Sequence, residues 1–157
     1  MDRRDPQRET LYEWERAYVD ARWPPETMSA EEVRALVVRV SAVLRIPEPT
    51  ISFKSIDISC KARPLANRLD IADWGRTRPT ILHEMAHLGS WRAVLRGDTP
   101  HGVAFTTMAI ALYHRFLGMP LDYLEESAAS RGLAFVPAAM AGNVLAGKAP
   151  ETYAEDF

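Results

Sequence analysis

Two histidines and a glutamate lie in a stretch of the chain that otherwise reads as buried core, PTILHEMAHLGSW, residues 79–91. His83, Glu84 and His87 are its only readily ionisable side chains. Burying three such groups without partners would be costly in free energy. We therefore expect them to share a partner, and the residue types favour a metal ion with its bound water.

The five residues HEMAH, 83–87, have the spacing of a helical zinc motif. Positions i and i+4 lie on one face of a helix, so both imidazoles can bind one ion while the glutamate lies near the open coordination position. The segment must then be helical, and an apolar stripe of Ile81, Met85 and Leu88 supports this. Two hydrogen-bonded histidines inside an apolar helix are the alternative interpretation.

A catalytic zinc site needs a third protein ligand and one position left for water. His101 is the leading candidate, because it follows a chain reversal at Gly97 and begins a helical stripe of apolar residues. A surface or capping role is the alternative interpretation of His101. Other candidates for the third ligand are Glu125 and Glu126, on a short helix, and Asp98, in the turn.

The elements around these residues predict an α+β fold. Helical periodicity and capping signals predict helices over about residues 5–22, 29–47, 78–97, 99–118 and 122–131. Thr99 is expected to cap the fourth of these helices, with Pro100 as its first residue. Alternating apolar residues predict two or three short strands between about residues 50 and 72, at Ile51 and Phe53, Ile56 and Ile58, and Leu69 and Ile71.

Length and composition predict one globular domain over residues 1–157, since 47% of the residues are hydrophobic. The net charge of −2 gives no general attraction to nucleic acid or to anionic membranes. The one cysteine, Cys60, supplies no zinc cluster and favours a reducing compartment, so we expect a cytoplasmic protein without a membrane span. The tryptophans are expected to be packing anchors, at positions 14, 23, 74 and 91.

The combination of HEMAH with HGVAF, residues 101–105, resembles the SprT-like zinc metallopeptidases, which include DNA–protein crosslink proteases of the Spartan type. The resemblance covers residues 69–116, including a strand-like LDIA before the motif helix. It implies a zincin-like fold of the SprT or minigluzincin type. It also implies Zn²⁺ as cofactor, with His83, His87 and His101 as metal ligands and Glu84 as catalytic base.

The opening RDPQRETLYEWE, taken with that middle region, also resembles short metallohydrolases of actinobacteria and their phages that have no assigned substrate. The chain departs from Spartan-type enzymes because it has no C-terminal cysteine-rich zinc ribbon and no strongly basic tail. DNA-dependent activity is therefore not expected.

The predicted function is a zinc-dependent hydrolase of amide bonds, acting as a peptidase on a protein or peptide substrate. Three neutral histidines leave zinc its full charge, which lowers the pKa of a bound water to about 7. Glu84 would take the proton of that water as general base. An Arg or Tyr could stabilise the developing negative charge, but the sequence does not identify it. The alternative is a catalytically silent zincin scaffold with a structural metal, serving interaction or regulation.

Overall fold

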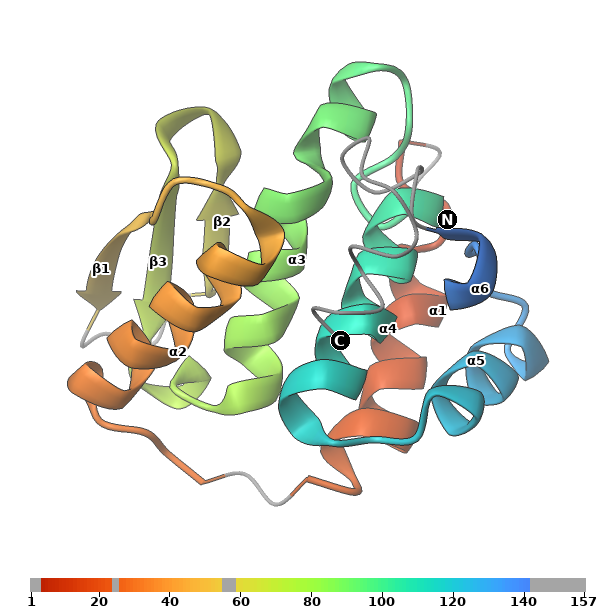
Figure 1. Ribbon diagram of the computed structural model, residues 1–157, viewed down its shortest axis with the longest axis horizontal. Helices are drawn as coiled ribbons and strands as arrows, with labels where there is room; N and C mark the ends of the chain where they lie inside the picture. Colours follow the sequence, from red (N-terminus) through yellow and green to blue (C-terminus); the bar gives the residue numbers. More distant parts are fainter. Residues whose placement is uncertain (1–3, 24–25, 55–58, 142–157) are drawn as a thin grey trace.

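The computed structural model describes residues 4–23, 26–54 and 59–141, and it shows an α+β arrangement of helices with a small sheet at one side (Figure 1). The elements in chain order are α1 (Arg8–Trp14), η1 (Glu15–Asp20), α2 (Ala30–Leu44), β1 (Thr50–Lys54), β2 (Lys61–Arg63), η2 (Pro64–Ala66), β3 (Arg68–Ala72), η3 (Asp73–Gly75), α3 (Arg78–Leu95), α4 (Val103–Leu117), α5 (Leu121–Ser130) and α6 (Ala138–Ala141). The α+β class predicted from the sequence is confirmed. No helix in these ranges is long and apolar enough to cross a membrane.

The first predicted helix is present, but its second half is a π-helix, η1, that follows α1 without a break. Leu11 and Trp14 are fully buried. The Trp14 indole Nε1 also donates a hydrogen bond to Ser127 Oγ in α5 at 2.9 Å. Apolar burial and this bond together fix α1 against the helices of the C-terminal half.

The helix α2 begins at a capping box formed by Ser29 and Glu32. Ser29 Oγ accepts a hydrogen bond from the Glu32 amide at 3.1 Å, and Glu32 Oε1 accepts one from the Ser29 amide at 3.2 Å. This reciprocal pair satisfies two amides that the first helical turn leaves free. The helix then buries one apolar face, formed by Val33, Leu36, Val37, Val40 and Leu44.

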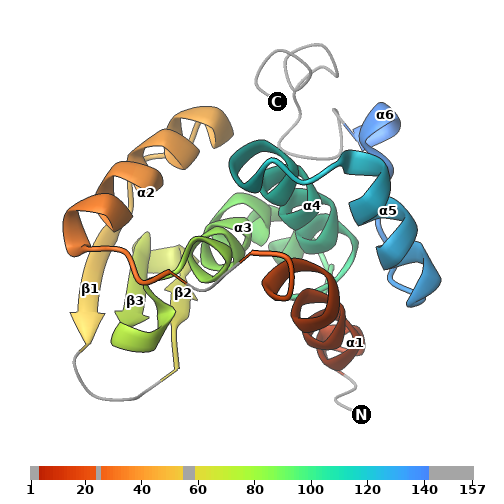
Figure 2. The ribbon, with the colours of Figure 1, turned by 90° about the horizontal axis from the view of Figure 1, so that it is seen from below.

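The sheet has the strand order β1-β3-β2, with β1 parallel and β2 antiparallel to the central β3. Strands β1 and β3 confirm the prediction at Ile51 and Phe53 and at Leu69 and Ile71, whereas Ile56 and Ile58 lie outside the described residues. The short strand β2 was not predicted, because a three-residue segment with two basic side chains carries no strand signal. It occupies the sheet edge nearest α3 (Figures 1 and 2).

The helix α3 lies in the middle of the molecule, between α2 with the sheet on one side and α1 with α4 on the other (Figure 2). It begins at Arg78, as predicted, and Thr77 caps it by accepting a hydrogen bond from the Thr80 amide at 3.5 Å. Its apolar residues pack on those of α4, and the fully buried members are Ile81, Leu82, Met85, Phe105, Met108 and Leu112. The motif helix is therefore held on both sides.

The start of α4 differs from the prediction, since the helix begins at Val103 and its N-cap is Gly102, not Thr99. Asp98 explains the difference, because its carboxylate accepts hydrogen bonds from the amides of Thr99 at 2.8 Å and Ala104 at 2.9 Å. These bonds close a turn over residues 98–102. His101 consequently lies in the turn before α4 and not in the stripe of the helix itself.

Candidate metal centre

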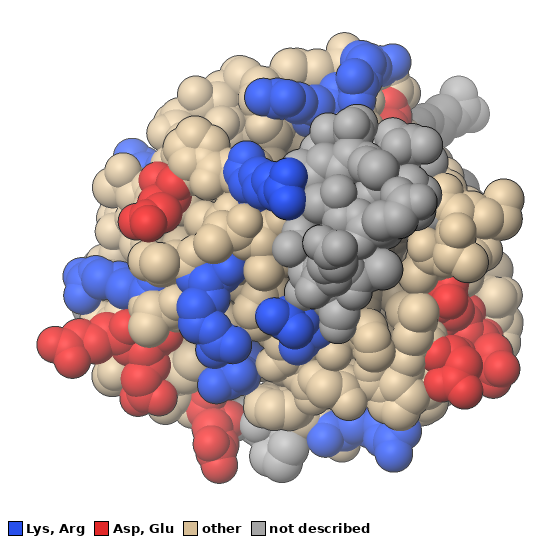
Figure 3. Space-filling model, viewed as in Figure 1, with Lys and Arg blue, Asp and Glu red and all other residues tan. Residues whose placement is uncertain are grey.

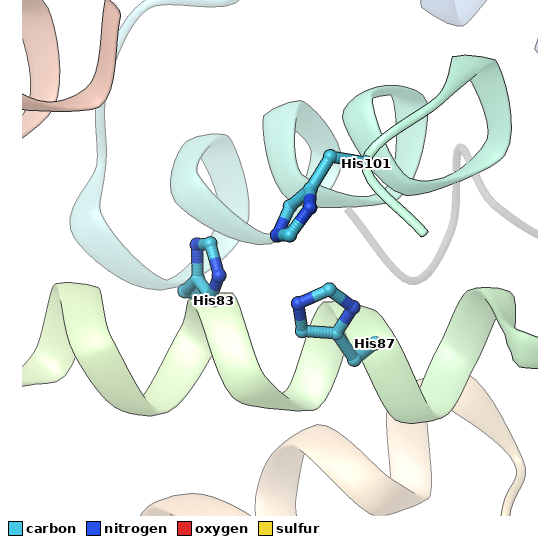
Figure 4. Close-up of side chains that lie close together, drawn as sticks. All are labelled: His83, His87 and His101. Carbon is cyan, nitrogen blue, oxygen red and sulfur yellow. The ribbon is translucent and has the colours of Figure 1, made fainter. Parts of the chain in front are cut away.

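Three histidines converge between α3 and the turn that precedes α4. His83 and His87 project from α3 one turn apart, and His101 faces them from the turn (Figure 4). One ring nitrogen of each histidine lies within 4.8 Å of those of the other two. In the part of the chain that the structure describes, this is the cluster of side chains that could hold a metal ion. The predicted convergence of the three histidines is thus confirmed.

Carboxylates hold the outer nitrogens of two of these rings. His83 Nδ1 lies 2.7 Å from Glu15 Oε2, and His101 Nδ1 lies 2.6 Å from an oxygen of Asp5. A carboxylate on Nδ1 fixes the orientation of the ring and leaves Nε2 for an ion, as in the outer shell of many zinc sites. The side chains present therefore fit a divalent metal in both ligand type and support.

Asp5 also fixes the backbone of the turn that carries His101. Its second oxygen accepts a hydrogen bond from the His101 amide at 3.1 Å. Gln7 Nε2 donates to the His101 carbonyl at 3.0 Å. The segment before α1 thus holds His101 through both its side chain and its main chain.

Glu15 serves two donors at once, because the Tyr113 hydroxyl donates to the same carboxylate oxygen that contacts His83. Glu15 is 8% exposed and Tyr113 is 1% exposed, so this network is shielded from water. Burial raises the pKa of Tyr113 well above its ordinary value. The hydroxyl therefore remains a donor that keeps Glu15 in place under His83.

The surroundings give the histidines opposite protonation preferences. Burial lowers the pKa of His83, but the charge and hydrogen bond of Glu15 outweigh this and raise it to about 9. For His87, burial first and then the nearby His83 and His101 lower the pKa to about 2. His87 is thus ready as a neutral ligand, whereas His83 must release a proton to bind a metal.

Glu84 follows His83 on α3 and lines the space in front of the histidines, with only 7% of its surface exposed. Burial raises the pKa of its carboxyl, while a hydrogen bond from the Ala62 backbone in β2 partly opposes this effect. A carboxylate with a raised pKa beside a metal position is suited to accept and return a proton.

The other candidate ligands have different roles. Asp98 uses its oxygens to close the turn before α4. Glu125 Oε2 accepts a hydrogen bond from the Ala138 amide at 3.1 Å, and neither Glu125 nor Glu126 belongs to the histidine cluster. Within the described ranges, the sequence alternatives for the third position therefore reduce to His101.

Two adjoining cavities open beside the histidines. The larger, about 590 Å³, is lined by all three histidines, and the smaller, about 330 Å³, by His83. Both cavities share Tyr12, Ser59, Cys60, His83 and Glu84 as lining residues. Such a cleft has the size of a small-ligand site.

The tryptophan prediction is correct only in part. Trp14 is fully buried and is a packing anchor, but Trp74 is 54% exposed and lines the smaller cavity. Trp91 lines the larger one. Two aromatic side chains are therefore available to contact a bound molecule.

Sequence reasoning missed Asp5, Tyr12 and Glu15. All three lie on the first segment of the chain, where the acidic residues read as an ordinary solvated helix face. A spacing signal could not have found them, because Glu15 and His83 are 68 positions apart and Asp5 and His101 are 96 apart.

Comparison with known protein families, curated proteins and solved structures finds no match for this chain. The similarity to SprT-like metallopeptidases therefore stays a prediction from the motif residues.

Proposed function

We propose that the protein is a zinc-dependent hydrolase that cleaves amide bonds, with a peptide or protein as substrate. The observation that carries the proposal is the convergence of His83, His87 and His101, with carboxylates on the outer nitrogens of two rings. Glu84 supports catalysis over a purely structural site, because such a site needs no buried carboxylate facing the cleft.

In this proposal His83 and His101 hold the ion through the nitrogens that Glu15 and Asp5 leave free, and His87 supplies the third nitrogen. The ion would supply Lewis acidity and lower the pKa of a water to about 7. Glu84 accepts a proton as the water oxygen bonds to the carbonyl carbon. It then gives that proton to the leaving nitrogen as the C–N bond breaks.

The edge strand β2 supports a peptide over a small amide as substrate. Its residues Lys61 and Ala62 line the larger cavity, and among the described residues its one strand partner is β3, on one of its two edges. An extended peptide can add to such an edge by main-chain hydrogen bonds. This would align a scissile bond beside Glu84.

On the displayed face of the molecule, basic and acidic side chains are spread among each other (Figure 3). This mixture is typical of a solvated surface and matches the small net charge of −2.

The test is Glu84→Gln, which keeps the shape of the side chain but removes the base. We expect the variant to bind zinc at one ion per chain and to lose roughly 10²- to 10⁴-fold in hydrolysis of casein or a peptide library. Glu125→Gln, far from the histidines, is the matched control and should retain activity. Equal hydrolysis by the wild type and Glu84→Gln would refute the proposal. A wild-type protein that binds zinc and cleaves none of these substrates would favour the silent scaffold.

A further inference from the structure

Tyr12 places a hydroxyl group at the mouth of the histidine cluster. It comes from α1, is half-buried, and lines both cavities. Its hydroxyl lies 3.4 Å from His101 Nε2. Its ring lies 5.1 Å from the ring of His101 and 5.8 Å from that of His83.

The Tyr12 hydroxyl approaches Nε2 of His101, the ring nitrogen that an ion would use. Asp5 occupies Nδ1 of His101, so Nε2 is the nitrogen left for an ion. Two ligands of one tetrahedral zinc ion, each bound at about 2.0–2.1 Å, lie about 3.3–3.4 Å apart. The Tyr12 hydroxyl thus lies beside the nitrogen at which an ion would bind, within reach of an oxygen held by the same ion.

Arg8 leaves the hydroxyl of Tyr12 able to donate towards the cleft. The Arg8 guanidinium lies 5.5 Å from the centre of the Tyr12 ring. A guanidinium has only donors, so towards Arg8 the phenol oxygen can only accept. The phenol hydrogen faces His101 Nε2 in this structure, and it becomes available to another acceptor once that nitrogen binds an ion.

The helix that carries Tyr12 is held in place before any ligand binds. Leu11 and Trp14, on either side of Tyr12 in α1, are fully buried, and Trp14 is also hydrogen-bonded to α5. A donor held in place in advance stabilises developing charge without reorganising during the reaction.

We propose that Tyr12 is a catalytic residue whose hydroxyl donates a hydrogen bond to the carbonyl oxygen of the scissile amide as negative charge develops there. This inference rests on the proposed hydrolase function. It assigns the charge-stabilising group that the sequence could not identify.

The experiment compares Tyr12→Phe with a control, Tyr18→Phe. Tyr18 lies further along the same helical segment, in η1, and its ring packs on Tyr123 away from the cavities. Both variants are loaded with zinc, and zinc content is measured by elemental analysis. Binding of acetohydroxamate, a small chelator with a carbonyl oxygen, is then measured by calorimetry, and casein hydrolysis is measured in parallel.

We expect Tyr12→Phe to keep one zinc per chain and to bind acetohydroxamate at least about tenfold more weakly than wild type, with Tyr18→Phe unchanged. Turnover of casein should fall roughly 10²- to 10³-fold with little change in KM. Equal acetohydroxamate affinity in wild type and Tyr12→Phe would overturn the proposal. Loss of zinc from Tyr12→Phe would also overturn it, because Tyr12 would then be a metal ligand or a structural residue.

The acetohydroxamate measurement tests the role of Tyr12, and the casein measurement tests the proposed function on which that role rests. A wild-type protein without hydrolytic activity would defeat the proposed function, yet the acetohydroxamate comparison would still decide whether Tyr12 donates to an oxygen at the ion. A zinc-loaded wild type that does not bind acetohydroxamate would overturn the role of Tyr12 directly.

Discussion

Replacing Glu15 with glutamine should remove the proton that His83 carries in the metal-free protein. The Glu15 carboxylate lies 2.7 Å from His83 Nδ1 and raises the pKa of His83 to about 9 against the effect of burial. Glutamine keeps an oxygen that can accept from Tyr113 but has no negative charge. In Glu15→Gln, burial should therefore dominate and leave His83 neutral at pH 7.

The size of the effect follows from the pKa. At pH 7, a group with a pKa of about 9 is unprotonated in only about 1% of molecules, so the apparent zinc affinity is about 100-fold below its value at high pH. This corresponds to about 2.7 kcal/mol. In the wild type, log K for zinc should rise by about one per pH unit between pH 7 and 9 because of His83. In Glu15→Gln this contribution should vanish, although loss of the supporting carboxylate should weaken binding at high pH by about 10- to 100-fold.

Calorimetry in buffers of different ionisation enthalpy measures the protons released as zinc binds. At pH 7 we expect the wild type to release about one proton more than Glu15→Gln, since ionisation of a bound water contributes to both proteins. Glu13→Gln, an exposed position on the same helix, is the control and should match the wild type. Equal proton release from wild type and Glu15→Gln would show that the reasoning about His83 is wrong. Nitrogen NMR of the metal-free imidazoles provides a second check, with His83 expected to titrate near pH 9.

Two further predictions concern the ligand set and the metal-free protein. His101→Ala should lose stoichiometric zinc in elemental analysis, whereas Glu125→Ala should retain it; the opposite pattern would move the third ligand to α5. Because the folded-state pKa of His83 is raised to about 9 from about 6.5, its protonation stabilises the metal-free fold fully below about pH 6.5, and this contribution is lost as pH rises through 9. Thermal unfolding of the metal-free wild type should therefore show falling stability from pH 7 to 9, and a smaller fall in Glu15→Gln would assign it to His83.

The motif helix could be predicted because its signals are local. Spacing of i and i+4 placed His83 and His87 on one face, and the predicted start near residue 78 matches the start of α3 at Arg78. The approach of His101 was also predicted, although the start of α4 was not. Thr99 and Pro100 looked like a helix start, but the Asp98 carboxylate accepts hydrogen bonds from the amides of Thr99 and Ala104 and closes a turn there, so the helix begins only at Val103.

The supporting shell could not be predicted because it depends on contacts between distant parts of the chain. Asp5 and Glu15 become partners of histidines only when α1 packs beside α3 and α4, and β2 is recognisable only through its pairing with β3. Polar residues on a charged helix give no sign of which of them will be buried. Tertiary packing, not local preference, selected these residues.

Asp5, Tyr12 and Glu15 all precede the motif in the chain, and this order limits what a fragment or a motif search can report. A piece of the protein beginning at α2 would still contain HEMAH and His101 and would satisfy any pattern written for them. It would nevertheless lack Asp5, which orients His101, Glu15, which raises the pKa of His83, and Tyr12, which lines the cleft. Truncations near the first residues therefore remove parts of the candidate metal centre, and assays should place purification tags elsewhere.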